Sequence, residues 1–305
     1  MPGLTDPRAV SRARLLPLLR ELGDVKRVRS AGRIGSIAER LFRRGWADLV
    51  RGRPVAEVAL AVTARGVAAT RLGDLDVEAL VGLGLSPEDV RHVTEQALAQ
   101  FEGLLPEVLL RDLAAALRQD MATDISDVPA FVGHLADQPR AGVTCPGRPR
   151  IILQPPENHA EHCLVVAVYA VLLAEPGTDL GTVFLAGLAH HLHNASMPDA
   201  GFTGEELLGQ HLAPVMQHAA EHALLELPSG LRSAVETARR ILPDIASPEG
   251  RAFHAADVLD RVLEIEQHLR AARLTMDEVL GEMALVHDGP VKPFHDAVLG
   301  EFGLA

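Results

Sequence analysis

Hydrophobic residues recur along most of this chain at spacings of three and four, the period of an amphipathic α-helix. Aromatic residues are only 3% of the chain, so the core must be built mainly from Leu, Val and Ala, a composition that favours helices over sheets, and we expect an all-α fold. The expected helices are one that begins after Ser36, 55–72, one that begins at Ser86-Pro87, 106–121, 129–136, 158–174, 180–194, 203–226, 228–242, 248–273, 275–286 and a last segment near 293–302. Capping-box patterns are predicted at three of these starts, namely Ser36 with Glu39, Thr203 with Glu206 and Thr275 with Glu278.

The helical period is interrupted between Asp137 and Asn158, where five prolines fall within about twenty residues. This composition predicts a linker, so we divide the chain into an N-terminal helical region at 1–136, a Pro/Gly-rich linker at 137–158 and a helical domain at 159–305. The short run Ile151 to Leu153 can form an extended segment, but the sequence indicates no partner strand for it.

The composition is that of a globular protein, with 48% hydrophobic and 23% charged residues among 305. The longest uninterrupted apolar run, Cys163 to Ala174, has twelve residues, whereas a membrane span needs about 20, so it predicts a buried core helix. The N-terminus lacks the apolar stretch of a secretory signal, and the two cysteines suit reduced thiols. We therefore expect a cytoplasmic protein without a membrane contact.

The net charge of −12 is unevenly distributed, because residues 8–53 hold 13 Lys and Arg against 4 Asp and Glu. This basic segment can pair with the acidic remainder of the chain or contact an anionic ligand. It lacks interleaved aromatic residues and a Gly-rich phosphate loop, so we do not expect a nucleic-acid partner. The sequence leaves a homo-oligomer open.

Twelve of the fourteen histidines lie from His159 onward, and many have helical spacing beside apolar residues. Neutral imidazoles are common metal ligands, and helical bundles often build metal sites from His and Asp side chains. Other histidines of this half border apolar faces in the same way, as packed core or helix-edge residues do. The histidines with helical spacing beside apolar residues are His159 and His162, then His190, His191 and His193, then His211, His218 and His222, and finally His254, which precedes Asp257 by three residues.

Three of these segments resemble the HD-domain superfamily of metal-dependent phosphohydrolases. Glu161-His162 followed by apolar residues looks like the family's first histidine, and Ala186 to Leu192 looks like the context of its His-Asp doublet. The stretch Ala255 to Leu259, with Asp257, looks like its terminal aspartate. The resemblance covers roughly residues 155–275 and implies an HD-like helical bundle in the C-terminal half.

The resemblance implies that His162, His190, His191 and Asp257 hold a divalent transition metal ion, such as Mn, Fe, Zn, Co or Ni. One departure is clear, because the doublet reads His190-His191 and a histidine stands where the family has its aspartate. The site can then be mononuclear, recruit other histidines, or be a degenerate core that binds no metal. Further ligands, or residues that support the ligands, are sought among His159, His193, His218, His222 and His254.

The resemblance further implies that the protein hydrolyses a small-molecule phosphate ester, which can be a nucleotide. Lys292 and Arg261 are then candidates to bind the phosphate, as are Arg239 and Arg240 by their chemistry. Two alternatives stay open. The first is a non-catalytic helical scaffold or ligand-binding protein with a degenerate site, and the second is a diiron oxygenase of the same superfamily.

Overall fold

The computed structural model describes residues 12–119, 128–144, 147, 149–271, 273, 292, 293, 296 and 299, and these confirm the all-α fold. The helices are α2 (Leu16–Asp24), α3 (Ile37–Val50), α4 (Val55–Leu72), α5 (Val77–Gly82), α6 (Pro87–Ala99), α7 (Glu107–Gln119), α8 (Ala130–Asp137), α9 (His159–Leu173), α10 (Leu180–Ala189), α11 (Gly201–Leu208), α12 (Leu212–Leu224), α13 (Ser229–Arg239) and α14 (Pro248–Ala271), with 3-10 turns η1 (Leu192–Ala195) and η2 (Gly209–His211). The predicted helix at 275–286 and most of the segment at 293–302 lie outside the described residues.

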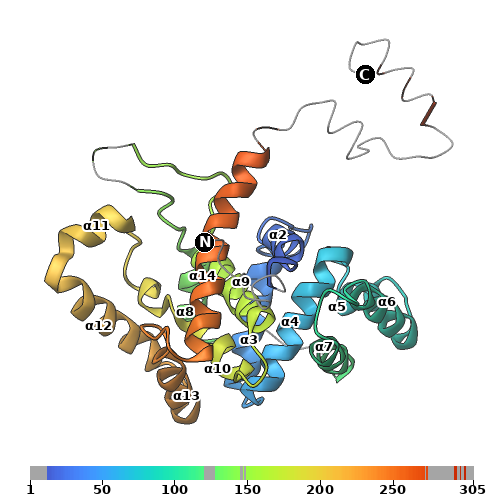
Figure 1. The fold of residues 1–305 in the computed structure, drawn as a ribbon, viewed down its shortest axis with the longest axis horizontal. Coiled ribbons are helices and arrows are strands. Elements are labelled where there is room, and N and C mark those ends of the chain that lie inside the picture. Colours follow the sequence, from blue (N-terminus) through green and yellow to red (C-terminus); the bar gives the residue numbers. More distant parts are fainter. Residues whose placement is uncertain are drawn as a thin grey trace, which may run out of the picture. The chain divides into compact units, whose positions relative to one another are not determined.

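Helix α9 forms the centre of the fold, as the apolar run from Cys163 predicts. All of its residues are buried, and it packs against α2, α3, α4, α8 and α10 (Figure 1). Gly187 of α10 lies against the backbone of Ala167 in α9, so closely that a Cβ at this glycine would stand 2.5 Å from the Cα of Ala167. Because glycine alone allows this approach, it sets the distance between the two helices that carry most of the histidines discussed below.

Most helix starts follow from the capping residues that the sequence offers. Ser36 accepts a hydrogen bond from the backbone N–H of Glu39, and Ser86 accepts one from that of Asp89. The predicted helix at 203–226 is wrong as a single element, because Gly209, at φ 50°, ends α11 and η2 separates it from α12. The capping box at Thr203 is also wrong, since Thr203 lies inside α11, which begins at Gly201.

The predicted linker folds back on itself. Val143 forms an antiparallel bridge with Ile151, which gives the extended segment at 151–153 the partner that the sequence did not indicate, and Pro139 forms a second bridge with Asn158. Asp199 accepts a hydrogen bond from the backbone N–H of Ala141, which joins this segment to the start of α11. The residues at 138–141 and 157–159 are therefore held in a defined register.

The chain divides into two compact units, Met1–Arg261 and Val262–Ala305. The first unit contains helices from both sides of the linker, with α3 and α4 packed on α9 and α10. The division at 137–158 stays a prediction about the sequence segments. Among the described helices, none has both the length and the apolar character of a bilayer-spanning segment.

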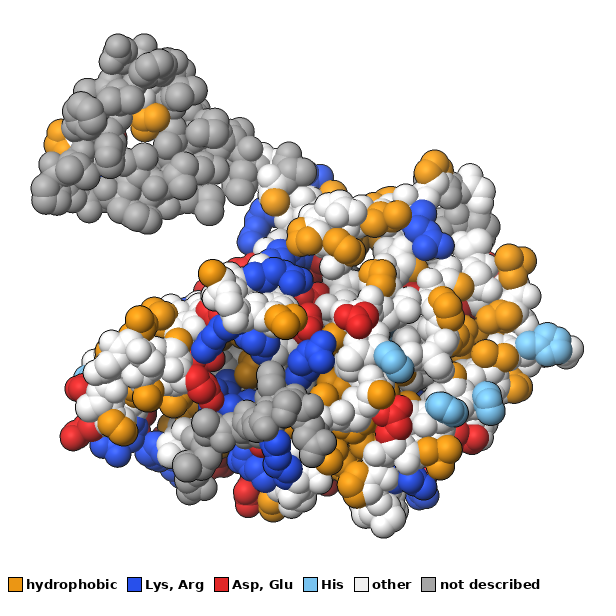
Figure 2. Space-filling view, turned by 180° about the vertical axis from the view of Figure 1, so that it is seen from behind, with side chains coloured by type: hydrophobic (Ala, Val, Ile, Leu, Met, Phe, Trp, Pro, Cys, Tyr) orange, Lys and Arg blue, Asp and Glu red, His pale blue; other side chains and the backbone are white. Residues whose placement is uncertain are grey.

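Described residues of the basic segment pair with carboxylates that follow it in the sequence. Arg33 contacts Asp74 and Asp76 at 3.1 and 2.7 Å, and Arg44 contacts Glu78 at 3.1 Å. Basic and acidic side chains are accordingly interspersed on the face drawn in Figure 2. The uneven charge along the sequence is thus partly balanced within the first unit.

We expect Gly187→Ala to lower the free energy of unfolding by about 1–3 kcal/mol, because the added methyl group collides with the backbone of α9. The control is Gly133→Ala in α8, where a Cβ would meet no atom within 4 Å and the higher helix propensity of alanine can add up to about 1 kcal/mol. Urea denaturation of both variants checks the pair, and equal stability of the two would contradict the close contact of α9 and α10.

Candidate metal centre

His162 lies in the first turn of α9, and a complete capping box fixes this turn. The side chain of Asn158 accepts from the backbone N–H of Glu161, while the carboxylate of Glu161 accepts from the backbone N–H of Asn158. His162 is fully buried. The predicted first histidine of the site therefore stands on a rigid, sequence-encoded helix start.

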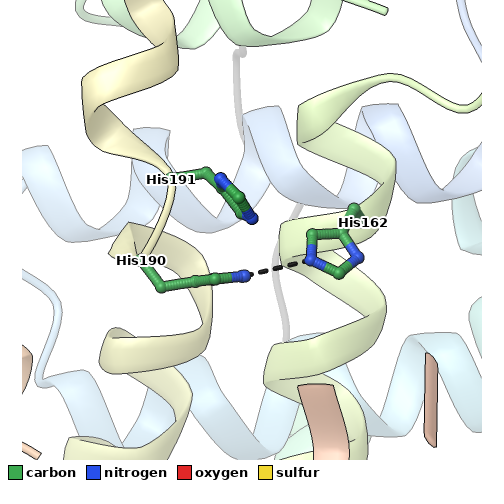
Figure 3. Close-up of side chains that lie close together, drawn as sticks. All are labelled: His162, His190 and His191. Atoms are coloured by element: carbon green, nitrogen blue, oxygen red, sulfur yellow. Dashed lines mark hydrogen bonds between the residues drawn. The ribbon is translucent and has the colours of Figure 1, made fainter. Parts of the chain in front are cut away.

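His190 and His191 follow the last residue of α10. On a continuous helix, adjacent side chains diverge by about 100°. The helix ends at Ala189, and His191 has φ −103° and ψ 22°, so the backbone turns between the two histidines. Figure 3 shows both imidazoles projecting toward His162 on α9.

Asp257 and Asp260 lie three residues apart on α14 and hence on one helix face. An oxygen of Asp257 is 3.5 Å from Nε2 of His162, an ion-pair distance rather than a hydrogen bond. Asp260 is fully buried, and its Oδ2 is 2.7 Å from Nδ1 of the same histidine. His162 is therefore flanked by two carboxylates, one at each ring nitrogen.

The Nδ1 atom of each of the three histidines faces a hydrogen-bond acceptor. Nδ1 of His190 is 2.7 Å from the carbonyl oxygen of Gly187, which can only accept, so the ring donates through Nδ1. Nδ1 of His191 is 2.8 Å from Oδ1 of Asn194, whose amide nitrogen donates to the Met197 carbonyl. With Asp260 opposite His162, all three rings have Nδ1 committed as the donor, which leaves the Nε2 lone pairs for another partner.

These rings form one group, in which one ligand nitrogen from each histidine lies within 4.8 Å of the others. The Nε2 atoms of His162 and His190 are 3.1 Å apart. Two lone pairs repel one another, so this distance requires a shared proton or a cation that both nitrogens face. The arrangement therefore fits a metal ion, and its alternative is a protonated histidine pair.

A second group of close donors, Glu157, His162 and Asp260, is already filled by a cation. The buried ammonium of Lys26 contacts Glu157 and lies 2.5 Å from Oδ1 of Asp260. Burial raises the pKa of Asp260. The charge of Lys26 and the hydrogen bond with His162 lower this pKa by a larger amount, so it lies below its usual range. Asp260 is thus an ionised acceptor that orients His162 rather than an additional metal ligand.

Burial keeps the surrounding imidazoles neutral. It lowers the pKa of His190 to about 3 and that of His193 to about 4, and it lowers the pKa of His191 well below its usual value. Burial would raise the pKa of Asp257, but the polar contact with His162 and the positive charge of Arg261 lower it overall. Neutral imidazoles beside an ionised carboxylate are the protonation states in which these groups bind metal ions.

The other predicted ligands differ in their placement. His159 is fully buried, with its ring centroid 4.9 Å from that of His191, and His193 is buried 5.4 Å from His191 by the same measure. His254, on α14, is half-buried and stacks edge-on with Phe253. His218 and His222 are exposed on α12, and neither belongs to the groups of close ligand atoms in the described part of the chain.

The two residues predicted to contact the phosphate also differ in their placement. The guanidinium of Arg261 lies 3.1 Å from Asp257 and is half-exposed. Lys292 belongs to the second unit, where its ammonium pairs with Asp296 at 2.9 Å. Of the further candidates, Arg239 donates to the carbonyl of Ala189 at the end of α10, beside His190.

Sequence reasoning missed Asp260 and Lys26. Asp260 had a usable signal, because it lies one helical turn after Asp257 on the same face. Lys26 is one of only two lysines in a chain with 27 arginines, yet its segment contains so many cations that nothing marks it.

Comparison of the chain with models of protein families, with curated proteins and with solved structures gives no match. A relationship to the HD-domain superfamily therefore stays a prediction from the sequence.

We expect acid to destabilise the metal-free protein at unusually mild pH. The unfolded chain binds protons at its histidines below about pH 6.5, whereas His190 and His193 stay neutral in the folded protein down to about pH 3 and 4. Within this window, each such histidine lowers the free energy of unfolding by about 1.4 kcal/mol for every unit by which the pH falls. Above the window it does not change the free energy of unfolding. Urea denaturation in the presence of a chelator, at several pH values from about 7.5 down to about 5, measures how the free energy of unfolding changes with pH.

Replacing His193 with Gln should reduce the dependence of the free energy of unfolding on pH by about 1.4 kcal/mol per pH unit, because one buried neutral imidazole is removed. A stability that does not vary between these pH values would contradict the burial of neutral imidazoles.

Proposed function

We propose that His162, His190, His191 and Asp257 bind one divalent transition metal ion and that the protein is a metal-dependent phosphohydrolase that acts on a phosphate ester. The observation that carries the metal site is the common orientation of the three rings, each with Nδ1 committed as a donor and Nε2 left free. The reaction class follows from the resemblance of these segments to HD-domain phosphohydrolases.

The residues fit such an ion in donor type and in spacing. Three imidazole nitrogens and one carboxylate suit Zn, Mn, Fe, Co or Ni. Two nitrogens that each bind one ion at about 2.1 Å would be about 3 Å apart if they subtended roughly a right angle, and the observed separation of Nε2 of His162 and His190 is 3.1 Å. The Asp260 carboxylate supports His162 as the outer partners of metal-binding histidines commonly do.

The histidine at the second position of the doublet favours a single ion. A carboxylate can bridge two ions through its two oxygens, but neutral His191 offers one lone pair. Its Nδ1 is also engaged by Asn194. We therefore propose a mononuclear centre rather than the dinuclear centre that a diiron oxygenase requires.

When bound, a divalent ion would lower the pKa of a coordinated water toward neutrality and so would supply a nucleophile for phosphate-ester hydrolysis. The side chains contribute by orientation and charge. Lys26 and Asp260 hold the ring of His162, and Gly187 and Asn194 hold those of His190 and His191. Arg261 places a positive charge beside Asp257, where a phosphate oxygen can be neutralised.

We expect the freshly purified protein to contain about one equivalent of a transition metal by elemental analysis. The double variant His190→Ala and Asp257→Ala should lose it, because both changes remove direct ligands. His218→Ala, which removes an exposed histidine of α12, is the matched control and should retain the metal.

The same preparations are then assayed for release of inorganic phosphate from a panel of phosphomonoesters and nucleotides. Turnover by the metal-loaded protein, lost in the double variant, supports the phosphohydrolase. Metal without phosphate release but with iron-dependent oxygen consumption would favour the oxygenase. Absence of metal, even after incubation with these ions, would contradict the centre and leave a scaffold or ligand-binding protein.

We expect Asp260→Asn to weaken metal binding by about 10- to 100-fold, because an amide orients His162 less strongly than an ionised carboxylate does. Competition with a metal chelator measures the affinity. The control is Glu264→Gln on the same helix, one turn further along. If Asp260→Asn and the control bind metal equally, Asp260 does not support the centre.

A further inference from the structure

Two polar side chains next to the histidine cluster have buried nitrogens that lack a hydrogen-bond partner among the described residues. Both ring nitrogens of His159 are in this state, although the residue is fully buried. Nη1 of Arg140 is also buried and unpartnered. Since unsatisfied buried donors are costly and rare in folded proteins, two of them close together indicate a ligand that completes their hydrogen bonds.

The bridge between Pro139 and Asn158 brings these two side chains together. Around it, the backbone N–H of Arg140 donates to Glu157, and that of His159 donates to Gln138. In this antiparallel register Arg140 lies opposite Glu157, and His159 is the diagonal neighbour on the same face. Such a diagonal pair is about 7–8 Å apart at the backbone, within reach of long side chains.

The contacts that do exist leave the guanidinium of Arg140 available. Its Nε lies 3.8 Å from Glu157, beyond hydrogen-bond distance, and that carboxylate already contacts Lys26. For His159, Nε2 is 3.5 Å from Asp199, whose same oxygen accepts from the backbone N–H of Ala141. Neither carboxylate therefore satisfies the buried donors.

One member of this pair, His159, borders the candidate metal centre. The ring centroid of His159 is 4.9 Å from that of His191. Because Arg140 is the diagonal neighbour of His159 on the same face, a ligand held by both side chains would stand beside His191.

We propose that Arg140 and His159 form an anion-binding subsite that takes the phosphoryl group of the substrate, and of the phosphate product, beside the metal centre. The guanidinium supplies charge and a fork of donors that matches a tetrahedral anion, and the imidazole supplies a further N–H. This inference rests on the proposed phosphohydrolase function for its ligand class, while the site itself rests on the unpartnered donors.

Binding of inorganic phosphate to the full chain, measured by calorimetry with and without added manganese, tests the subsite. Arg140→Gln should weaken phosphate binding about tenfold or more, because it removes a charge-assisted hydrogen bond. His159→Phe, which keeps a ring of similar shape without donors, should also weaken it. Arg150→Gln is the matched control, since Arg150 belongs to the same segment but is exposed and donates to the Ala200 carbonyl.

Circular dichroism checks that each variant folds. Should Arg140→Gln not fold, Arg140→Lys replaces it, and the retained charge without the guanidinium fork should give a smaller but measurable loss. No binding of millimolar phosphate to the wild-type protein, or equal binding by all variants, would overturn the subsite.

Two results separate this proposal from the proposed function. Metal binding and turnover without any effect of Arg140→Gln or His159→Phe on phosphate affinity would leave the phosphohydrolase and remove the subsite. Phosphate binding that depends on Arg140 in a protein without metal or turnover would support the subsite and remove the phosphohydrolase.

Discussion

The buried carboxylate of Asp260 imposes the strongest constraint on this fold. It lies between the ammonium of Lys26, at 2.5 Å, and Nδ1 of His162, at 2.7 Å. A buried ion is tolerated only when its partners are in place, and loss of one partner of such a pair typically costs about 3–5 kcal/mol. The three residues come from the segment after α2, from α9 and from α14. Segments on both sides of the Pro/Gly-rich linker must therefore assemble together, which is one reason that they belong to one compact unit.

Much of the helical architecture could be predicted because its signals are local. The predicted and observed bounds of the helix at 55–72 coincide, and Ser36 and Ser86 cap their helices as expected. The single predicted helix at 203–226 was wrong for a physical reason. A 3-10 turn advances about three residues per turn, so the apolar spacing continues through η2 and hides the break at Gly209. Gly209 itself, the residue type that most readily takes the positive φ found there, is the local sign of the break in the sequence.

The candidate site was predictable only in part. The order of His162, His190, His191 and Asp257, each in an apolar context, singled out the residues that the structure brings toward one another. Lys26 and Arg140 could not be distinguished in the same way, since both lie among other charged residues in segments without a marked helical period. Their burial results from tertiary packing, which helical periodicity does not encode. Conversely, His218 and His222 share the helical spacing of buried histidines but are exposed on α12.

A histidine rather than a carboxylate at position 191 sets the charge balance of the proposed centre. Asp257 is the one carboxylate in the proposed ligand set, and Asp260 already shares its charge with Lys26. A divalent ion among three neutral imidazoles and one carboxylate carries a net charge of about +1, whereas a second carboxylate would make it neutral. Arg140 adds to this positive potential from the linker side, and its charge is only partly offset by Glu157. A centre of this charge would attract an anion without a second metal ion, so a histidine at position 191 is compatible with the proposed phosphoryl ligand at a single ion.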